Sequence, residues 1–173
     1  MRIRKLVAMV GAFLELCGCG GRVGDTKRGK TDRVLYVTNI GNDTVSVVSV
    51  PAEGDSFSLT SFGSRTGLSG PGGIAVDGMN QEIVVANAHN DSITVYARTD
   101  SGNIAPVRTI VGPSTGLGSP TGIAVDSVND EVVVANEGWT SILVFSRTAS
   151  GDVMPLRTIS GSSTNLREPT DLA

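Results

Sequence analysis

The chain repeats its own sequence after 49 residues. Residues 67–115 align with residues 116–164 without a gap, and 28 of the 49 positions are identical. A fixed period of this size is typical of proteins that stack similar supersecondary units, so that each unit buries the face of its neighbour. The repeat constrains the architecture more than the activity, because one repeat scaffold can serve many ligands.

Each repeat contains four short runs with the length and composition of β-strands. They lie at residues 73–77, 83–87, 92–96 and 106–110, and again at 122–126, 132–136, 141–145 and 155–159. Turn-forming pairs such as Asp77-Gly78 separate the runs. No window has the 3.6-residue apolar spacing of an amphipathic helix. The sequence therefore predicts an all-β domain.

Four strands in about 40 to 50 residues are typical of one blade of a β-propeller. The second run of each repeat, at residues 83–86 and 132–135, is continuously apolar rather than alternating. This pattern is expected of a strand that is covered on both faces. We therefore predict a β-propeller of four-stranded blades that pack face to face.

Partial copies flank the two clear repeats. Residues 35–39 and 42–47 align with the second and third runs, and residues 169–173 restart the first run. We assign blades approximately to residues 33–66, 67–115 and 116–164, with the start of another at 165–173. A closed propeller has about 4 to 8 blades. We therefore expect a fragment of a six- or seven-bladed ring or, if the chain is complete, a half-ring that closes by self-association.

The runs resemble known repeat families. Residues 71–77, 83–87 and 92–96 resemble the NHL repeat, and residues 35–39 with 44–47 resemble the YVTN repeat. The sequence is also similar to bacterial lactonase-like propellers. All of these resemblances imply a β-propeller fold, and the last implies, as an alternative function, a hydrolase of the lactonase type.

The N-terminus predicts export. Residues 1–5 are basic, and residues 6–16 form a largely apolar stretch that is too short to span a bilayer but typical of a secretory signal. Residues 16–19 resemble the lipobox of bacterial lipoproteins, which implies cleavage before Cys19 and a lipid anchor on its sulfur. We predict a signal peptide at 1–18, a flexible tether at 19–32 and a membrane-anchored protein facing the periplasm or cell surface. The alternative is a plain signal peptide with incidental cysteines.

The charge balance argues against a nucleic-acid partner. The net charge is −3, and removal of residues 1–18 would take away three basic residues and one acidic residue, leaving −5. Nucleic-acid binding needs clustered basic residues, and the basic cluster at residues 27–30 lies in the predicted tether. We expect the membrane as a partner through the lipid anchor, and an unknown protein or carbohydrate as the ligand.

The sequence offers little catalytic chemistry. Residues 112–116 match the Gly-x-Ser-x-Gly pattern, but a nucleophile elbow needs a helix after the serine, and no helix is predicted there. His89 is the only histidine, which excludes a cluster of histidine metal ligands or a repeated Ser-His pair in this chain. We place no catalytic residue and lean towards a protein without enzymatic activity.

Two recurring carboxylates are candidate metal ligands. Asp77 and Asp126 end the first run of successive repeats, and in propellers that strand lines the central channel. A ring of such carboxylates would suit a divalent cation such as calcium in the channel. The alternative, which recurrence favours, is that each carboxylate caps the turn towards Asn80 or Asn129.

Positions that differ between repeats are candidates for ligand binding, because the scaffold does not demand them. His89 and Asn90 correspond to Gly138 and Trp139, so the only histidine and the only tryptophan occupy the same loop of adjacent blades. This loop is expected to share a face with the connections at 112–119 and 161–168. We predict that His89, Asn90 and Trp139 contact a ligand. Packing of Trp139 over a neighbouring blade is the alternative.

These observations lead to one functional prediction and two alternatives. The prediction is an exported, lipid-anchored β-propeller that acts as a binding or interaction scaffold at the cell envelope. The first alternative is a lactonase-like hydrolase. The second is a purely structural surface repeat.

Overall fold

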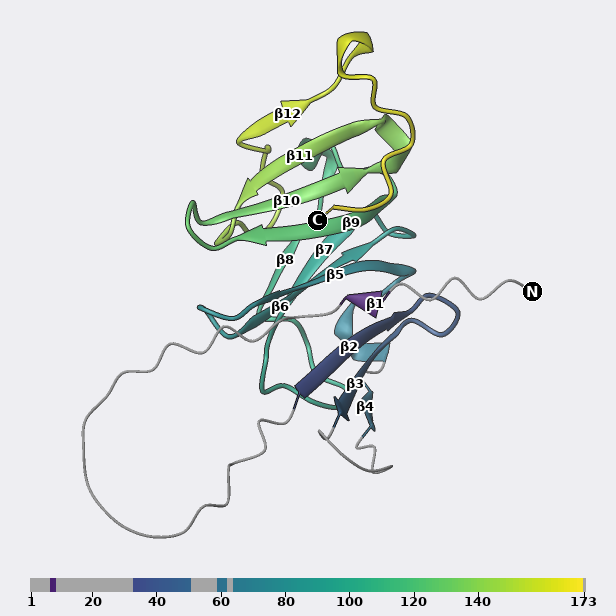
Figure 1. Ribbon diagram of the computed structural model, residues 1–173, viewed down its shortest axis with the longest axis vertical. Coiled ribbons are helices and arrows are strands. Elements are labelled where there is room, and N and C mark those ends of the chain that lie inside the picture. Colours follow the sequence, from purple (N-terminus) through teal and green to yellow (C-terminus); the bar gives the residue numbers. More distant parts are fainter. Residues whose placement is uncertain (1–6, 9–32, 51–58, 62–63, 173) are drawn as a thin grey trace, which may run out of the picture.

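The computed structural model describes residues 7–8, 33–50, 59–61 and 64–172. Their strands form three antiparallel sheets of four strands each, stacked one on the next (Figure 1). The strands are β1 (Val7–Ala8), β2 (Arg33–Asn39), β3 (Thr44–Val50), β4 (Leu59–Ser61), β5 (Pro71–Asp77), β6 (Glu82–Asn87), β7 (Ser92–Ala97), β8 (Arg108–Ile110), β9 (Pro120–Asp126), β10 (Glu131–Asn136), β11 (Ser141–Ser146) and β12 (Arg157–Ile159).

Helical structure in this part of the chain is limited to single 3-10 turns. They are η1 (Ser64–Thr66), η2 (Pro113–Thr115), η3 (Glu137–Trp139) and η4 (Ser162–Thr164). None of the helices among the described residues is long and apolar enough to cross a membrane. The predicted all-β fold with four-stranded blades is confirmed.

Each 49-residue repeat forms one sheet. Residues 67–115 contain β5 to β8 and residues 116–164 contain β9 to β12, and strands that follow one another in the chain are neighbours in the sheet. β8 and β12 begin two residues later than the sequence predicted. The preceding Pro106 and Pro155 have no N–H group to donate to a regular ladder, which explains the later start.

The first sheet is less regular than the other two. β2 and β3 contain the predicted strand residues and pair over their full length. β1 pairs with the inner side of β2, in the place that β5 and β9 hold in the other sheets. β1 belongs to the stretch predicted as a signal peptide. The rest of that stretch, Cys19 and the predicted tether lie outside the described residues.

Apolar side chains fill the spaces between the sheets. Ile83 and Val85 of β6 pack in the cluster between the first and second sheets, whereas Val84 and Ala86 pack between the second and third. All four side chains are at most 1% exposed. The continuous apolar run of β6 therefore reflects burial on both faces of one strand, as expected.

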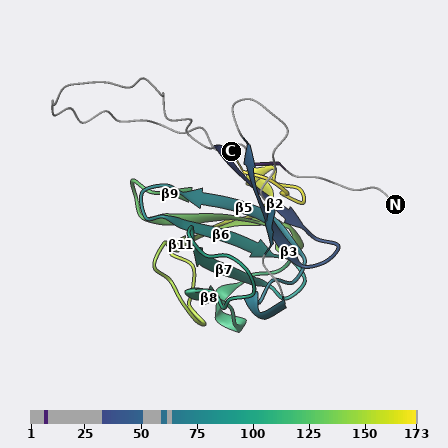
Figure 2. The same ribbon diagram turned by 90° about the horizontal axis from the view of Figure 1, so that it is seen from below.

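The inner strands of successive sheets approach each other through their backbones. A Cβ atom at Gly73 of β5 would collide with the carbonyl oxygen of Thr121 in β9, and one at Gly122 would lie 2.7 Å from the Cα of Asp171. The hydroxyl of Thr121 also donates to the carbonyl of Pro169, at 3.1 Å. The glycines thus allow β5 and β9 to lie side by side (Figure 2), with residues 169–171 along β9.

Candidate functional site

The structure places the candidate residues at two opposite ends of the blades. Asp77 ends β5 and pairs with Glu82 at the start of β6, whereas Asn87 ends β6 at the far side. Asp126 occupies the same place in the third sheet as Asp77 in the second. The other end carries His89, Asn90 and Trp139. The predicted metal ligands and the predicted ligand loop are therefore separate sites.

The carboxylate of Asp77 closes the turn that follows β5. Its Oδ1 accepts hydrogen bonds from the backbone N–H groups of Met79 and Asn80, both at 3.0 Å, and its Oδ2 accepts one from Asn80 Nδ2 at 2.8 Å. Asp126 makes the equivalent three bonds in the turn after β9. This geometry is the turn-capping role that recurrence in the repeat favoured.

Asp77 differs from Asp126 in its surroundings. Asp77 is fully buried, and it also accepts a hydrogen bond from Ser127 of the third sheet at 3.2 Å. Burial opposes ionisation of Asp77, but the hydrogen bonds from Asn80, Ser127 and Met79 together hold its pKa below the usual value. The pKa of Asp126 is lowered mainly by its side-chain bond from Asn129. Both carboxylates are therefore charged at neutral pH.

An ion-pair network continues from Asp77 between the second and third sheets. Arg108 forms two hydrogen bonds to Glu82, both at 2.7 Å, and this bidentate contact is the main reason why the pKa of Glu82 is lowered. Arg147 of the third sheet contacts Glu82 at 3.3 Å, Asp77 at 3.9 Å and Asp130 at 2.9 Å. The network joins the two blades.

The divalent cation expected in the channel stays a prediction. Among the described residues, no group of three or more His, Cys, Asp or Glu is arranged to hold a metal ion. At this end of the blades, the oxygens of Asp77 and Asp126 already accept hydrogen bonds from protein donors.

At the other end, a buried asparagine fixes both the loop and the link between blades. Asn136 Oδ1 accepts a hydrogen bond from the N–H of Gly118 at 2.7 Å, and its Nδ2 donates to the carbonyl of Gly116 at 3.0 Å and to Ser141 Oγ at 3.1 Å. The N–H of Gly138 adds a backbone bond to the carbonyl of Gly118, at 3.0 Å. The β10–β11 loop and the connection at 112–119 therefore share one face, as expected.

The rings of His89 and Trp139 each lie over a glycine of the preceding connection. A side chain at Gly70 would collide with the imidazole of His89, and one at Gly118 would collide with the indole of Trp139. The Trp139 side chain is nevertheless 69% exposed. The backbone therefore fixes the indole on one side and leaves most of it open to solvent. The two rings belong to the loops of different blades.

The Asn90 side chain makes hydrogen bonds to its own hairpin and to the connection before it. Its Oδ1 accepts a hydrogen bond from Ser92 Oγ at 2.7 Å, and its Nδ2 lies 3.4 Å from the carbonyl oxygen of Gly67. These contacts account for an asparagine at this position by local structure alone.

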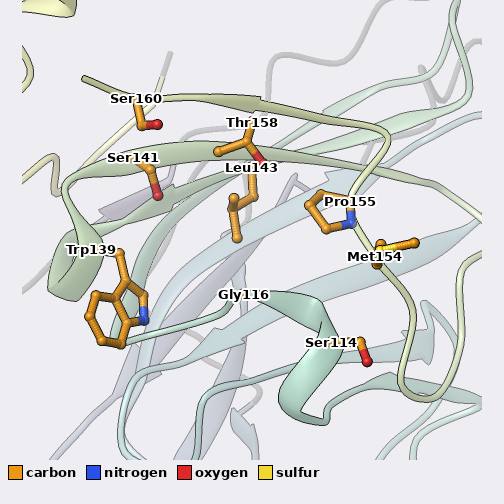
Figure 3. Close-up of a pocket in the computed structure, with 9 residues that line it drawn as sticks. All are labelled: Ser114, Gly116, Trp139, Ser141, Leu143, Met154, Pro155, Thr158 and Ser160. Atoms are coloured by element: carbon orange, nitrogen blue, oxygen red, sulfur yellow. The ribbon is translucent and has the colours of Figure 1, made fainter.

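Trp139 forms one wall of a groove with a volume of about 490 Å³ between η2 and the outer strands β11 and β12. In Figure 3, Trp139 stands at one end of this groove, Met154 and Pro155 stand at the other, and Leu143 projects between them. The lining residues are Ser114, Gly116, Trp139, Ser141, Leu143, Met154, Pro155, Thr158 and Ser160. Four of them are large and apolar, four carry hydroxyl groups, and none is charged.

Sequence reasoning found Trp139 but missed the rest of this groove. The other groove residues could have been recognised by the signal that pointed to Trp139, which is a difference between equivalent positions of successive repeats. Five of the nine lining positions differ from the preceding repeat, where the counterparts of Ser114, Trp139, Leu143, Met154 and Ser160 are Arg65, Asn90, Thr94, Ala105 and Val111. Only the fold shows that these five positions meet in space.

Ser114 is not a nucleophile elbow. The turn that contains it is a single 3-10 turn of three residues instead of an α-helix. Its hydroxyl donates to Asp152 Oδ2 at 3.1 Å, and its N–H donates to Asp152 Oδ1 at 2.7 Å. The Gly-x-Ser-x-Gly pattern therefore marks a loop that Asp152 stabilises, as expected from the missing helix.

A comparison with known protein families identifies the family of this blade arrangement. Residues 21–116, more than half of the chain, match the family described as lactonase, 7-bladed β-propeller. The chain belongs to this family. No curated protein matches the sequence of this lactonase-family propeller.

Solved structures with the same fold are distant in sequence. Hydrazine synthase of Kuenenia stuttgartiensis is 19% identical with a TM-score of 0.55, over 88% of this chain and 40% of its own. A functionally unknown protein from Desulfotomaculum acetoxidans is 13% identical with a TM-score of 0.55, over 81% and 42%. The WD40 β-propeller domain of Doa1 is 11% identical with a TM-score of 0.52, over 70% and 40%. At these identities the likeness shows the fold alone, and the chain spans about two fifths of the length of each structure.

Proposed function

We propose that this lactonase-family propeller is a binding scaffold, exported and lipid-anchored at the cell envelope, whose ligand occupies the groove beside Trp139. The observation that carries the proposal is the indole itself, which lies against Gly118 while 69% of its surface is exposed. An exposed aromatic side chain that borders a partly apolar groove is typical of a contact surface.

Packing alone accounts poorly for this position. The preceding repeat builds the same loop with Asn90, which satisfies its hairpin through hydrogen bonds. The third repeat replaces it with a tryptophan and supplies Gly118 beneath the ring, where the preceding repeat has Ser69. A change that exposes more apolar surface costs solvation free energy. Ligand binding is a function that would offset this cost.

The cellular location rests on the sequence. The basic start, the apolar stretch and the lipobox-like residues 16–19 support cleavage after residue 18 and lipid attachment at Cys19. Cleavage would also remove β1 from the inner side of the first sheet. We also propose that the repeats are of the NHL and YVTN type, on the residues that carry the resemblance. In a bacterial host, we expect Cys19→Ser to abolish lipid labelling and release the protein from the membrane fraction.

A screen of ligand classes tests the binding function. The melting temperature of the full chain is measured with neutral sugars, sugar acids, peptides and lactones. We expect at least one class to raise it saturably, and Trp139→Asn to remove the shift. Asparagine is the residue that the preceding repeat carries at this position, so the scaffold accepts it. Val128→Met, at an 89% exposed position at the opposite end, is the matched control. Absence of any shift, or an equal shift in Trp139→Asn, would contradict the proposal.

A hydrolase of the lactonase type is the second candidate, and the family match favours it. In this case the inner strands, where Asp77 and Asp126 end β5 and β9, would face the reaction, and a divalent cation would take part. The assay is lactone hydrolysis by the full chain with calcium or with a chelator. Turnover that depends on the cation and falls in Asp77→Asn would favour the enzyme. A protein with neither binding nor turnover would be a structural surface repeat.

A further inference from the structure

We infer that the ligand of the Trp139 groove is a neutral glycan, with one sugar ring stacked on the exposed face of the indole. This inference rests on the proposed binding function and adds the chemistry of the ligand.

The first step is the charge of the groove. None of its nine lining residues is charged. The acid closest in the hydrogen-bond network, Asp152, already accepts hydrogen bonds from both the N–H and the hydroxyl of Ser114. An anionic ligand group would lose water in this groove without gaining an opposite charge, which is unfavourable. The first blade has Arg65 where the second blade has Ser114, so this wall of the groove carries no charge at that position. The groove therefore suits a neutral ligand better than an anionic one.

The second step is the mixture of groups on its walls. Trp139 and Met154 offer exposed apolar surface beside Pro155 and the largely buried Leu143, while Thr158 and Ser160 offer hydroxyl groups that both donate and accept. The hydroxyls of Ser114 and Ser141 already bond to Asp152 and Asn136. A sugar ring has the complementary mixture, because its C–H groups form apolar faces and its hydroxyls surround the rim. Such a ring would lie flat on the indole while its hydroxyls reach the serine and threonine side chains.

The third step is the size and position of the groove. Its volume of about 490 Å³ lies within the range of about 300 to 1,000 Å³ that is usual for small-ligand sites. Trp139 and Met154 stand at its two ends (Figure 3), which suits a short run of sugar units between them. The lining comes from β11, β12 and the adjoining connections and not from the inner strands. The site is thus distinct from the inner-strand region that a hydrolase would use.

A peptide fits this groove less well. Extended peptides are commonly bound by backbone hydrogen bonds along an open strand edge. Ser141, Leu143 and Thr158 line the groove from the face of the β11–β12 pair, and Leu143 is paired with Thr158 in the sheet. The polar side chains among these three residues are the hydroxyls of Ser141 and Thr158. The arrangement favours a sugar over a peptide strand.

The experiment uses the indole as its own reporter. Trp139 is the only tryptophan, so intrinsic fluorescence of the full chain reports this groove directly. The protein, kept free of sugar-based detergents, is titrated with maltotriose, cellotriose and triacetylchitotriose, and with a decaproline peptide for comparison. We expect a saturable change in emission with at least one trisaccharide and none with the peptide.

Variants are compared by calorimetry, which does not need the indole. We expect Trp139→Asn to weaken trisaccharide binding at least tenfold and Met154→Ala severalfold. Both introduce the residue of the preceding repeat, Asn90 or Ala105, so the scaffold tolerates them. Trp139→Phe should keep part of the affinity, because a smaller aromatic face remains. Val128→Met should bind as the wild type does.

Three results would overturn the inference. Binding of decaproline but of no trisaccharide would agree with the binding function but would show that the ligand is a peptide and not a glycan. Trisaccharide binding that Trp139→Asn leaves unchanged would place the sugar elsewhere on the molecule. Failure of all three trisaccharides to bind would exclude a neutral glycan. The scaffold function would still be decided by the wider screen of ligand classes.

Discussion

The second and third sheets have nearly the same sequence but different surroundings. Ile93 and Ile110 of the second sheet are 0% and 1% exposed, because the third sheet covers them. Their counterparts 49 residues later are Ile142, which is half-buried, and Ile159, which is 49% exposed. The neighbouring blade, and not the blade's own sequence, therefore decides whether an apolar strand face becomes core.

The charged residues also show that burial depends on the neighbouring blade. The pair of Arg108 with Glu82 in the second sheet corresponds to the pair of Arg157 with Glu131 in the third. Arg147 of the third sheet adds a contact to the first pair. The Arg108 side chain is 19% exposed, whereas that of Arg157 is 56% exposed. A repeated ion pair becomes partly buried only where a further blade packs over it.

The largest expected effect on stability comes from truncating the same core isoleucine in the second and in the third sheet. Ile93→Ala removes a side chain from a closed space and should lower the free energy of unfolding by about 2 to 5 kcal/mol. Ile142→Ala, the same change in the third sheet, should cost clearly less because its side chain already meets solvent. Chemical denaturation of both variants measures the difference. Equal losses would show that another surface covers the third sheet in solution.

The sequence predicted the local part of this architecture well. The strands of residues 67–164 and their order follow from apolar runs, turn residues and the period, all of which act within a few residues. The turn-capping role of Asp77 was one of two readings, and its hydrogen bonds favour it. β1 was missed, because residues 7–8 lie in a stretch with the composition of a signal peptide.

Contacts between blades could not be predicted in the same way. Arg147 reaches Glu82 across 65 positions of the chain, and no local pattern indicates that pairing. The groove likewise combines Ser114 with Ser160, which come from different repeats. Trp139 was found because it differs from its repeat counterpart. Its partners in the groove needed the fold before the same difference became informative.

An intermediate effect is expected from the repeated ion pair. Arg108→Ala removes two charge-assisted hydrogen bonds to Glu82 and one to the carbonyl of Arg147. We expect a loss of about 1.5 to 3 kcal/mol, as for hydrogen bonds to charged groups. Arg157→Ala, its counterpart, should cost clearly less, because the Arg157 side chain is 56% exposed and its ion pair is screened by solvent. Denaturant midpoints of the two variants give the comparison. A loss in Arg157→Ala as large as that in Arg108→Ala would remove the proposed effect of the neighbouring blade.

The smallest effect is expected in acid, and it compares Asp77 with Asp126. The pKa of Asp77 is lower in the folded protein than its usual value of 3.8. Its charge therefore contributes stability that is complete well above pH 3.8 and is lost as the pH falls through the lower folded value. Asp77→Asn lacks this contribution. Its free energy of unfolding should therefore fall furthest below that of the wild type near neutral pH, and the difference should shrink below about pH 4.

Asp126→Asn is the control for this titration. Asp126 makes the same turn bonds, and its pKa is also lowered, but its side chain lacks the blade-to-blade contacts with Ser127 and Arg147 that Asp77 makes. Urea midpoints of Asp126→Asn from pH 7 to pH 2 should show the same pH trend, with a smaller loss of stability relative to the wild type. If both variants lost the same stability, the contacts from the third sheet would add nothing to the carboxylate of Asp77. The difference between the two sheets would then lie in their apolar faces alone.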